Sequence, residues 1–189
     1  MDGSIWSDTL TGFREKVAGV AAVPAGVAVA AIMASLALAL LTKVVEITRG
    51  RKMFAGDAQQ AEVLIEAARR ESTLLADLAD EDIRVFHSYM KMPARERVGG
   101  AAMKEVIRVP MDAARAAVRG LDLCLDARTM GVTGLTAADL DAAVALLSGA
   151  VGVMLLSVES NLREIPADDA FIDEIKTELT SLRLLVQIR

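Results

Sequence analysis

Two long stretches of the chain are almost entirely apolar, and they set the expected architecture. Residues 17–42 contain no charged side chain, although Pro24 and Gly26 interrupt the first half of this run. Residues 142–158 form a second charge-free run with a similar mixture of small residues and leucine. A helix that is apolar on every side lies either in lipid or at the centre of a protein assembly. The part after Pro24 makes only about 24 Å of helix, short of a bilayer core of about 30 Å, so we favour two central protein helices over membrane spans.

The rest of the chain has the periodic apolar positions and the turn signals of further helices. We expect a short amphipathic helix at 4–16 capped by Ser4 or Ser7, and a turn marked by Pro24 and Gly26. The first central helix follows this turn, runs to about Arg49 and is stopped by Gly50, and a long helix at 55–92 ends before Pro93. We also expect helical residues 94–126 with a start or a kink at Pro110, a loop at Gly131 and Gly134, the second central helix from Thr136, and a last helix begun by Pro166 and Asp168–Asp169. Asp139, three residues after Thr136, has the spacing of a capping box. The sequence predicts an all-α multihelical bundle, with residues 1–189 in one domain.

Composition and charge narrow the functional classes. The net charge is −5 and only 3% of the residues are aromatic, which argues against a nucleic-acid partner. With Cys124 as the one cysteine and His87 as the one histidine, the chain has neither a disulfide framework nor a standard zinc site, and we expect no metal. Residues 2–16 mix acidic and basic side chains and lack the basic start of a secretory signal. We expect a cytoplasmic protein, and we regard membrane association as the less favoured alternative.

Helical geometry singles out Asp82 in the long helix. With 100° of rotation per residue, Leu75, Leu78, Phe86 and Tyr89 all fall within about 40° of Asp82. The carboxylate therefore lies in the middle of the apolar stripe, where it is costly unless it is paired, hydrogen-bonded or protonated. Such a position marks a candidate functional site. The alternative is a structural carboxylate that binds a neighbouring helix terminus or an arginine.

Three further features are weaker candidates. Ser157 and Asn161 are four residues apart on one face of the second central helix and could hydrogen-bond a ligand, or they could simply be packed and capping groups. Arg49, Arg51 and Lys52 cluster just after the first central helix. These cations complement the negative end of the helix dipole, and they could also hold an anionic ligand tail.

The order of these features resembles the cyclodeaminase/cyclohydrolase family over roughly residues 5–165. The family includes methenyl-tetrahydrofolate cyclohydrolases and the C-terminal half of formiminotransferase-cyclodeaminase. The segments that carry the resemblance are the Pro-Ala-Gly-Val-Ala-Val-Ala-Ala entry to the first central helix (24–31), the Thr-Arg-Gly-Arg-Lys-Met-Phe segment (48–54), Asp-Ile-Arg-Val-Phe (82–86), Val109-Pro110, Ala138-Asp139, and Ser-Val-Glu-Ser-Asn-Leu (157–162).

The resemblance implies an all-helical homodimer with a tetrahydrofolate derivative as substrate, bound near the glycine loop, and no metal or bound cofactor. The implied reaction is hydrolysis of methenyl-tetrahydrofolate or deamination of formimino-tetrahydrofolate. Asp82 would be the catalytic carboxylate, acting as a base and holding the cation. The other residues implied to contact the substrate are Gly26, Arg51, Lys52, Asp139, Ser157 and Asn161, with the two basic residues on the glutamate carboxylates.

The chain departs from the family pattern mainly at the glycine loop. Ala25 and Val27 replace two glycines, and Ala28 replaces a serine. A Cβ at such positions blocks close approach of a ligand to the backbone or the dihedral angle that glycine would supply. Ser157 and Glu46 stand where the family has asparagine. The alternative function is therefore an inactive or diverged family member that binds a folate or another pterin, or serves as an interaction protein.

Overall fold

The computed structural model describes residues 3–52, 54, 56–97, 100–166 and 170–187, and all regular structure in this part of the chain is helical. In chain order the elements are η1 (Ile5–Ser7), α1 (Leu10–Ala18), α2 (Gly26–Arg49), α3 (Ala58–Lys91), α4 (Ala94–Arg97), α5 (Ala101–Arg128), α6 (Leu135–Leu162) and α7 (Ala170–Gln187). The all-α prediction is confirmed.

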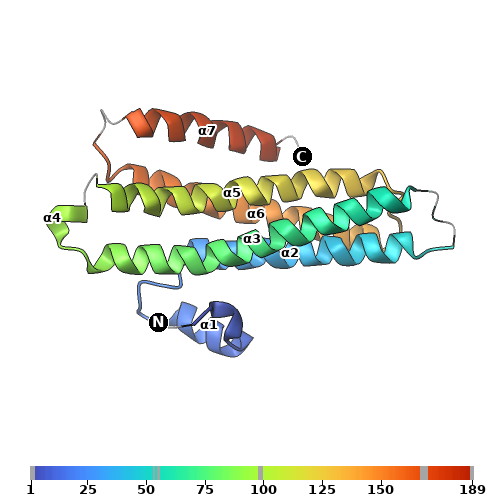
Figure 1. The fold of residues 1–189 in the computed structure, drawn as a ribbon, viewed down its shortest axis with the longest axis horizontal. Helices are drawn as coiled ribbons and strands as arrows, with labels where there is room; N and C mark the ends of the chain where they lie inside the picture. The colour runs from blue at the N-terminus through green and yellow to red at the C-terminus, as the bar shows by residue number, and fades with distance from the viewer. Residues whose placement is uncertain (1–2, 53, 55, 98–99, 167–169, 188–189) are drawn as a thin grey trace.

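Four long helices form an up-and-down bundle, in which α2 and α5 run opposite to α3 and α6 (Figure 1). Each of α2 and α5 packs against both α3 and α6, so the four helices close around one core. The predicted central helices are α2 and α6, and they are neighbours in the bundle. By length and composition both could cross a membrane, a test that core helices of soluble proteins also pass.

Small side chains allow these helices to approach closely. The buried face of α2 is largely alanine, and Gly120 on α5 faces it. A Cβ at Gly120 would lie 3.0 Å from Leu38 on α2 and 3.2 Å from Leu147 on α6. Ser35 of α2 and Ser72 of α3 exchange hydrogen bonds with each other's backbone carbonyl oxygens, both at 3.0 Å. These contacts fix how α2 sits in the bundle.

One side of the bundle, formed by α2 and α6, keeps an exposed apolar surface. On α2 it comprises the exposed Leu36 and Ile47, the half-buried Val29, Met33 and Leu40, and one charged residue, Lys43. These residues alternate in steps of four and three. On α6 the exposed residues with the same spacing are Ala138, Ala142, Ala145, Gly149, Gly152 and Leu156. The two rows adjoin, since a Cβ at Gly149 would lie 3.8 Å from Met33. We call them the α2 stripe and the α6 stripe.

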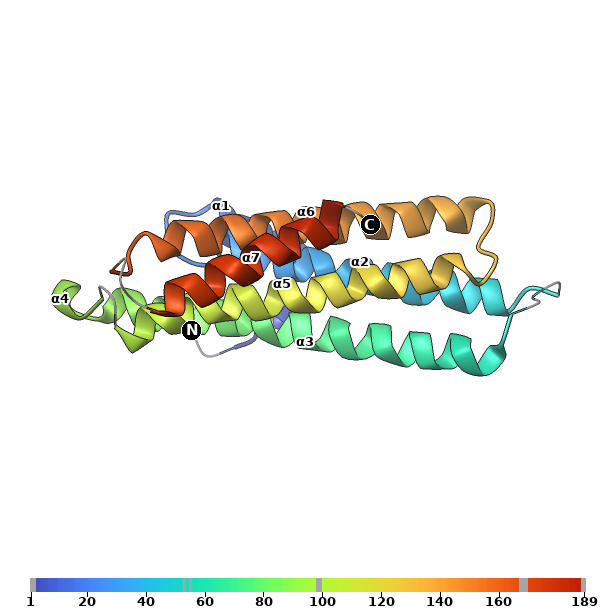
Figure 2. The ribbon, with the colours of Figure 1, turned by 90° about the horizontal axis from the view of Figure 1, so that it is seen from above.

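The two ends of the chain lie outside the bundle. The η1 turn is held on α3, where the Ile5 N–H donates to Asp80 at 2.9 Å and the Trp6 indole donates to the Ala76 carbonyl at 3.2 Å. The last helix, α7, packs across α5 and α6 (Figure 2).

Most predicted boundaries lie within three residues of the observed ones, and three local details are wrong. The predicted helical stretch 94–126 is divided into α4 and α5, and Gly100 is the N-cap of α5. The predicted 4–16 helix is divided into η1, capped by Ser4, and α1, capped by Thr9. Helix α6 begins at Leu135 with Gly134 as its N-cap, so Thr136 and Asp139 do not form a capping box. The reason is that the Thr136 hydroxyl instead donates to the Thr133 carbonyl at 2.8 Å. Pro110 lies inside a continuous α5. Asp168 and Asp169 lie outside the described residues.

Candidate active site

Asp82 lies on the inward face of α3, as the helical geometry predicts. Its stripe neighbour Leu75 is buried, and Leu78, Phe86 and Tyr89 pack against the core. Burial raises the pKa of the Asp82 carboxyl to about 6, and a backbone hydrogen bond from Ala28 opposes part of that rise. A carboxyl with a pKa near neutral can both accept and return a proton at cellular pH.

The group that reaches Asp82 is the N-terminus of α2. Ala28 is the third residue of this helix, and the N-cap residue Ala25 has no side chain that could cap the free N–H groups. A carboxylate is favoured there, because helix N-termini carry free N–H donors and the positive end of the dipole. Among the described residues no ion pair involves Asp82. The carboxylate is therefore held by a helix end and not neutralised by an arginine.

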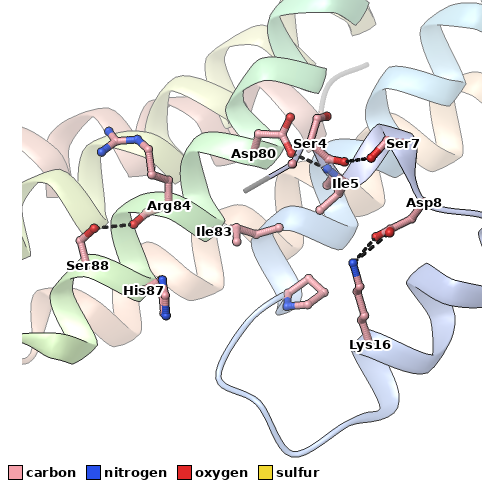
Figure 3. Close-up of a pocket in the computed structure, with 12 residues that line it drawn as sticks. Ser4, Ile5, Ser7, Asp8, Lys16, Asp80, Ile83, Arg84, His87 and Ser88 are labelled. Carbon is pink, nitrogen blue, oxygen red and sulfur yellow. Dashed lines mark hydrogen bonds and ion pairs between the residues drawn. The ribbon is translucent and has the colours of Figure 1, made fainter. Parts of the chain in front are cut away.

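Two cavities open beside Pro24, in the segment that leads into α2. One of about 540 Å³ lies between α3 and the N-terminal segment, and His87, Arg84 and the Lys16–Asp8 ion pair line it (Figure 3). The other, of about 620 Å³, is mostly apolar and is bounded by the 21–26 segment, α2 and α6. Asp82 itself lines neither cavity, and its carboxylate accepts a hydrogen bond from the Ala28 N–H at the start of α2.

In the altered glycine loop the Val23–Pro24 peptide bond is cis, and the residues after Pro24 have backbone angles that do not require glycine. Ala25 is extended, with φ −129° and ψ −163°, and Gly26 and Val27 begin the helix. Of the described residues only Gly131 and Gly134 have positive φ. The conformation of the loop therefore does not require the missing glycines, and the remaining consequence of Ala25 and Val27 is the space that their side chains fill.

A second group of predicted residues surrounds the other end of α2. The Arg51 guanidinium donates to the Thr133 hydroxyl at 2.8 Å, to the Thr133 carbonyl at 3.0 Å and to the Thr136 hydroxyl at 2.7 Å. Asp139 pairs with Lys43 of α2 at 3.0 Å. Lys52 is exposed in the turn after α2. These contacts tie the C-terminal end of α2 to the start of α6.

One chain does not bring the predicted site residues together. Asp82 lies at the N-terminal end of α2. At this end Gly26 faces α6, and a Cβ added at Gly26 would lie 3.6 Å from the Val153 side chain. Ser157 and Asn161 follow on the last turns of α6 at this same end. Along α2, Ala28 and Lys43 are 15 residues apart, or about 22 Å. The residues at the other end, Arg51, Lys52 and Asp139, are therefore out of reach of Asp82 within the chain.

The sequence did not reveal which groups hydrogen-bond to the predicted site residues at either end of α2. Lys43, Thr133 and the backbone N–H of Ala28 all contact predicted residues, yet none is close to its partner in the sequence. A backbone N–H donor cannot be recognised from the sequence, because every residue except proline has one. Lys43, a single charge on an otherwise apolar stripe, is the one signal that could have been noticed.

Comparisons with known proteins show the family of the chain. The family model for formiminotransferase-cyclodeaminase matches residues 9–181. The chain belongs to the formiminotransferase-cyclodeaminase family. Among solved structures it is similar to a formiminotetrahydrofolate cyclodeaminase from Thermotoga maritima, with 27% sequence identity, a TM-score of 0.88, and coverage of 97% of this chain and 92% of that one. No curated protein matches the chain. The resemblance drawn from the sequence is confirmed, and the whole bundle is shared with this member of the family.

Proposed function

We propose that the protein is a cytoplasmic folate one-carbon enzyme that closes formimino-tetrahydrofolate to methenyl-tetrahydrofolate with release of ammonia. The observation that carries this proposal is the inward-facing Asp82 carboxyl, with its raised pKa, at the N-terminus of α2. Family membership and the likeness to the Thermotoga maritima cyclodeaminase support the substrate class.

The chemistry requires one group that moves a proton between two nitrogens. The neighbouring amine of the carrier attacks the protonated formimino carbon, which forms the second C–N bond of the new ring. Asp82 takes the proton from that amine and returns it to the departing nitrogen, which leaves as ammonia when its C–N bond breaks. The remaining methenyl cation lies next to the carboxylate, whose charge stabilises it. Hydrolysis of methenyl-tetrahydrofolate needs the same carboxyl, with water as the attacking group.

We propose further that the enzyme is a homodimer in which the α2 stripe of one subunit packs on the α6 stripe of the other. The α2 stripe carries large side chains, with Leu36 52% exposed, whereas most of the α6 stripe is alanine and glycine. Large side chains from one copy fit into the row of small ones on the other, and a two-fold axis repeats that contact. A monomer would leave this surface in water.

An antiparallel dimer also accounts for the distance between the predicted site residues at the two ends of α2. If the two subunits met with their bundles parallel, both Lys43 side chains would lie at the same level of the apolar interface, which is unfavourable. In the antiparallel arrangement the two-fold axis passes near the middle of the stripe. The Lys43 side chain of each subunit then lies against the other half of the partner's stripe. The end with Arg51, Lys52 and Asp139 then lies beside the end with Asp82 and Asn161 of the second subunit. The complete site would contain residues from both chains.

A second candidate function is a non-catalytic pterin-binding protein. It is favoured by the side chains of Ala25 and Val27 at the loop and by the absence of Asp82 from the lining of both neighbouring cavities.

The deciding experiment follows the methenyl absorbance with formimino- and methenyl-tetrahydrofolate as separate substrates, on the wild type and two matched variants. Asp82→Asn removes the proton-moving group, and we expect a loss of about a hundredfold or more. Asp77→Asn makes the same change at an exposed site on α3 and should retain full activity. The wild-type rate should increase with pH around a midpoint near 6, because the base form of Asp82 is needed first. Folate binding without turnover of either substrate would support the second candidate.

A further inference from the structure

The N-terminal segment, residues 3–22, is held on the bundle by few contacts. Helix α1 buries none of its residues, Ile5 is the buried residue of η1, and Phe13 is half-buried against the core. In Figure 1 both elements lie outside the four long helices. A segment with few buried apolar contacts opens at a lower free energy than the core of a protein does. This segment can therefore leave the bundle while the long helices stay folded.

Two hydrogen bonds fasten the segment to α3. The Ile5 N–H donates to the Asp80 carboxylate at 2.9 Å (Figure 3), and the Trp6 indole N–H donates to the Ala76 carbonyl at 3.2 Å. Asp80 is two residues before Asp82 in the same helix. These two bonds, which we call the latch, therefore lie within one turn of the proposed catalytic carboxyl.

The segment is built to move as one unit about a single exposed connection. The Lys16 ammonium pairs with the Asp8 carboxylate at 2.7 Å, which ties α1 to the residue that follows η1. Val23 and Pro24 are buried at the entry to α2, whereas residues 19–22 are all exposed. When the latch opens, residues 19–22 can bend without the loss of a buried contact, and Val23 and Pro24 stay in place.

The segment also separates two cavities. Lys16 lines the cavity of about 540 Å³ and the next residue, Val17, lines the cavity of about 620 Å³, while Pro24 lines both. Ala21 and Ala22 of the exposed connection add to the wall of the second cavity. Movement of this segment therefore opens a wall of each cavity.

Asp82 lies close to both cavities and lines neither. The next residue in α3, Ile83, lines the first cavity, and Val29, the residue after the hydrogen-bond donor Ala28, lines the second. A half-buried carboxyl in this position meets a solute only when a neighbouring segment moves. The latched N-terminal segment is the neighbour with the fewest buried contacts to lose.

We propose that residues 3–22 form a lid, which opens by release of the latch, admits a solute to Asp82 and closes over it. That the solute is a folate rests on the proposed function, whereas the opening itself does not. A closed lid would keep bulk water away from the methenyl cation, which water would otherwise hydrolyse.

The first test follows the latch through Trp6, the one tryptophan of the chain. Its indole N–H gives a single signal in the NMR spectrum of the ¹⁵N-labelled protein, and exchange of this proton with solvent measures opening. Asp80→Ala removes the other latch bond and should speed this exchange roughly three- to tenfold, with an unchanged urea midpoint. Asp80→Asn keeps an acceptor oxygen and should resemble the wild type. Asp77→Ala, at an exposed position of α3, is the control and should change nothing.

The second test measures access to Asp82 directly, and it needs no turnover. Carbodiimide coupling of carboxyl groups to an amine, read by mass spectrometry, should label Asp82 faster in Asp80→Ala, by the same factor as the Trp6 exchange. Trp6→Phe, which removes the indole bond, should also speed the labelling. Exposed Asp77 is the internal reference. An unchanged Trp6 exchange rate in Asp80→Ala, or Asp82 labelling that does not follow the latch, overturns the lid.

The third test adds 5-formyltetrahydrofolate to the wild type. Closure over the bound folate should slow both the Trp6 exchange and the Asp82 labelling about threefold or more. Folate that binds in calorimetry and leaves both rates unchanged contradicts a lid over the site. If no folate binds, the proposed function fails, and the labelling of Asp82 in the latch variants still decides whether residues 3–22 control access to it.

Discussion

The two ends of α2 present opposite chemistry. At the N-terminal end, Asp82 is a half-buried acid held by a backbone N–H, and no cation pairs with it in the described part of the chain. At the C-terminal end, Arg51 is a fixed cation held by neutral oxygens. Each end therefore has, among the described residues, one charged group that is not paired with an opposite charge.

Under the proposed function, this difference gives a reason why the residues predicted to serve one reaction are spread along a whole bundle. A substrate that carries a cationic reacting carbon at one end and carboxylates at the other needs both kinds of group. Within one chain they are about 30 Å apart along α2. Two antiparallel copies, joined through the α2 and α6 stripes, would supply an acid and a cation to each of two sites.

The largest expected effect comes from mixing two inactive variants. Asp82→Asn and Arg51→Met should each lose most activity as homodimers. After joint unfolding and refolding, about half of the dimers are mixed, and one of the two sites in each mixed dimer is intact, so about a quarter of the wild-type activity should return. The measurement is the methenyl absorbance assay on the refolded mixture. A mixture as inactive as its components would mean that the two ends do not share a site.

A charge on the α2 stripe should separate the subunits. Leu36→Glu places a carboxylate in the middle of the proposed interface, and we expect monomers and a loss of activity of about tenfold or more. Size-exclusion chromatography with light scattering measures the mass. Leu74→Glu, on the exposed face of α3 outside the stripe, is the control and should remain dimeric. If wild-type protein is already monomeric, or is recovered only with membranes, the stripe has another role.

Asp82→Asn should make the protein more stable at neutral pH. The folded-state pKa, about 6, lies above the ordinary value of 3.8, so between these values the native state binds more protons than the unfolded state. The free energy of unfolding of the wild type therefore falls as pH rises from 4 to 6 and levels off above that, by about 2 to 3 kcal/mol in total. Urea unfolding at pH 4 and pH 7.5 measures it. The variant should be more stable at pH 7.5 only, and equal gains at both pH values would contradict a charge effect.

The smallest effect concerns the N-cap of α2, where Ala25 has no capping side chain of its own although Asp82 accepts a hydrogen bond from the Ala28 N–H. Ala25→Ser adds a hydroxyl at an extended N-cap position, which should stabilise the protein by about 1 kcal/mol in thermal or urea unfolding. The corresponding change at the N-cap of α6, Gly134→Ser, should destabilise, because Gly134 has φ +64°. If Gly134→Ser instead stabilised the protein, residue 134 of the variant would not have kept this positive φ.

Local pattern was sufficient for the helices and for the position of Asp82. The apolar runs gave α2 and α6, and the 100° spacing placed Asp82 on the inward face of α3, because both depend on neighbours within a few turns. The prediction of a capping box at Thr136 is wrong because local pattern does not decide which local hydrogen bond forms. Whether its hydroxyl bonds forward into the helix or back to Thr133 is a choice between two local contacts that residue type does not distinguish.

The sequence by itself determined an all-helical chain, its family and an acid among apolar neighbours, since periodicity and ordered motifs survive without knowledge of any contact. Only the tertiary structure decided that Asp82 meets the start of α2, that Arg51 is held by Thr133, and that the predicted site residues divide between two ends of the bundle. Those facts depend on which helices pack side by side and in which direction. Helix packing joins residues tens of positions apart, and no local pattern in the chain encodes that distance.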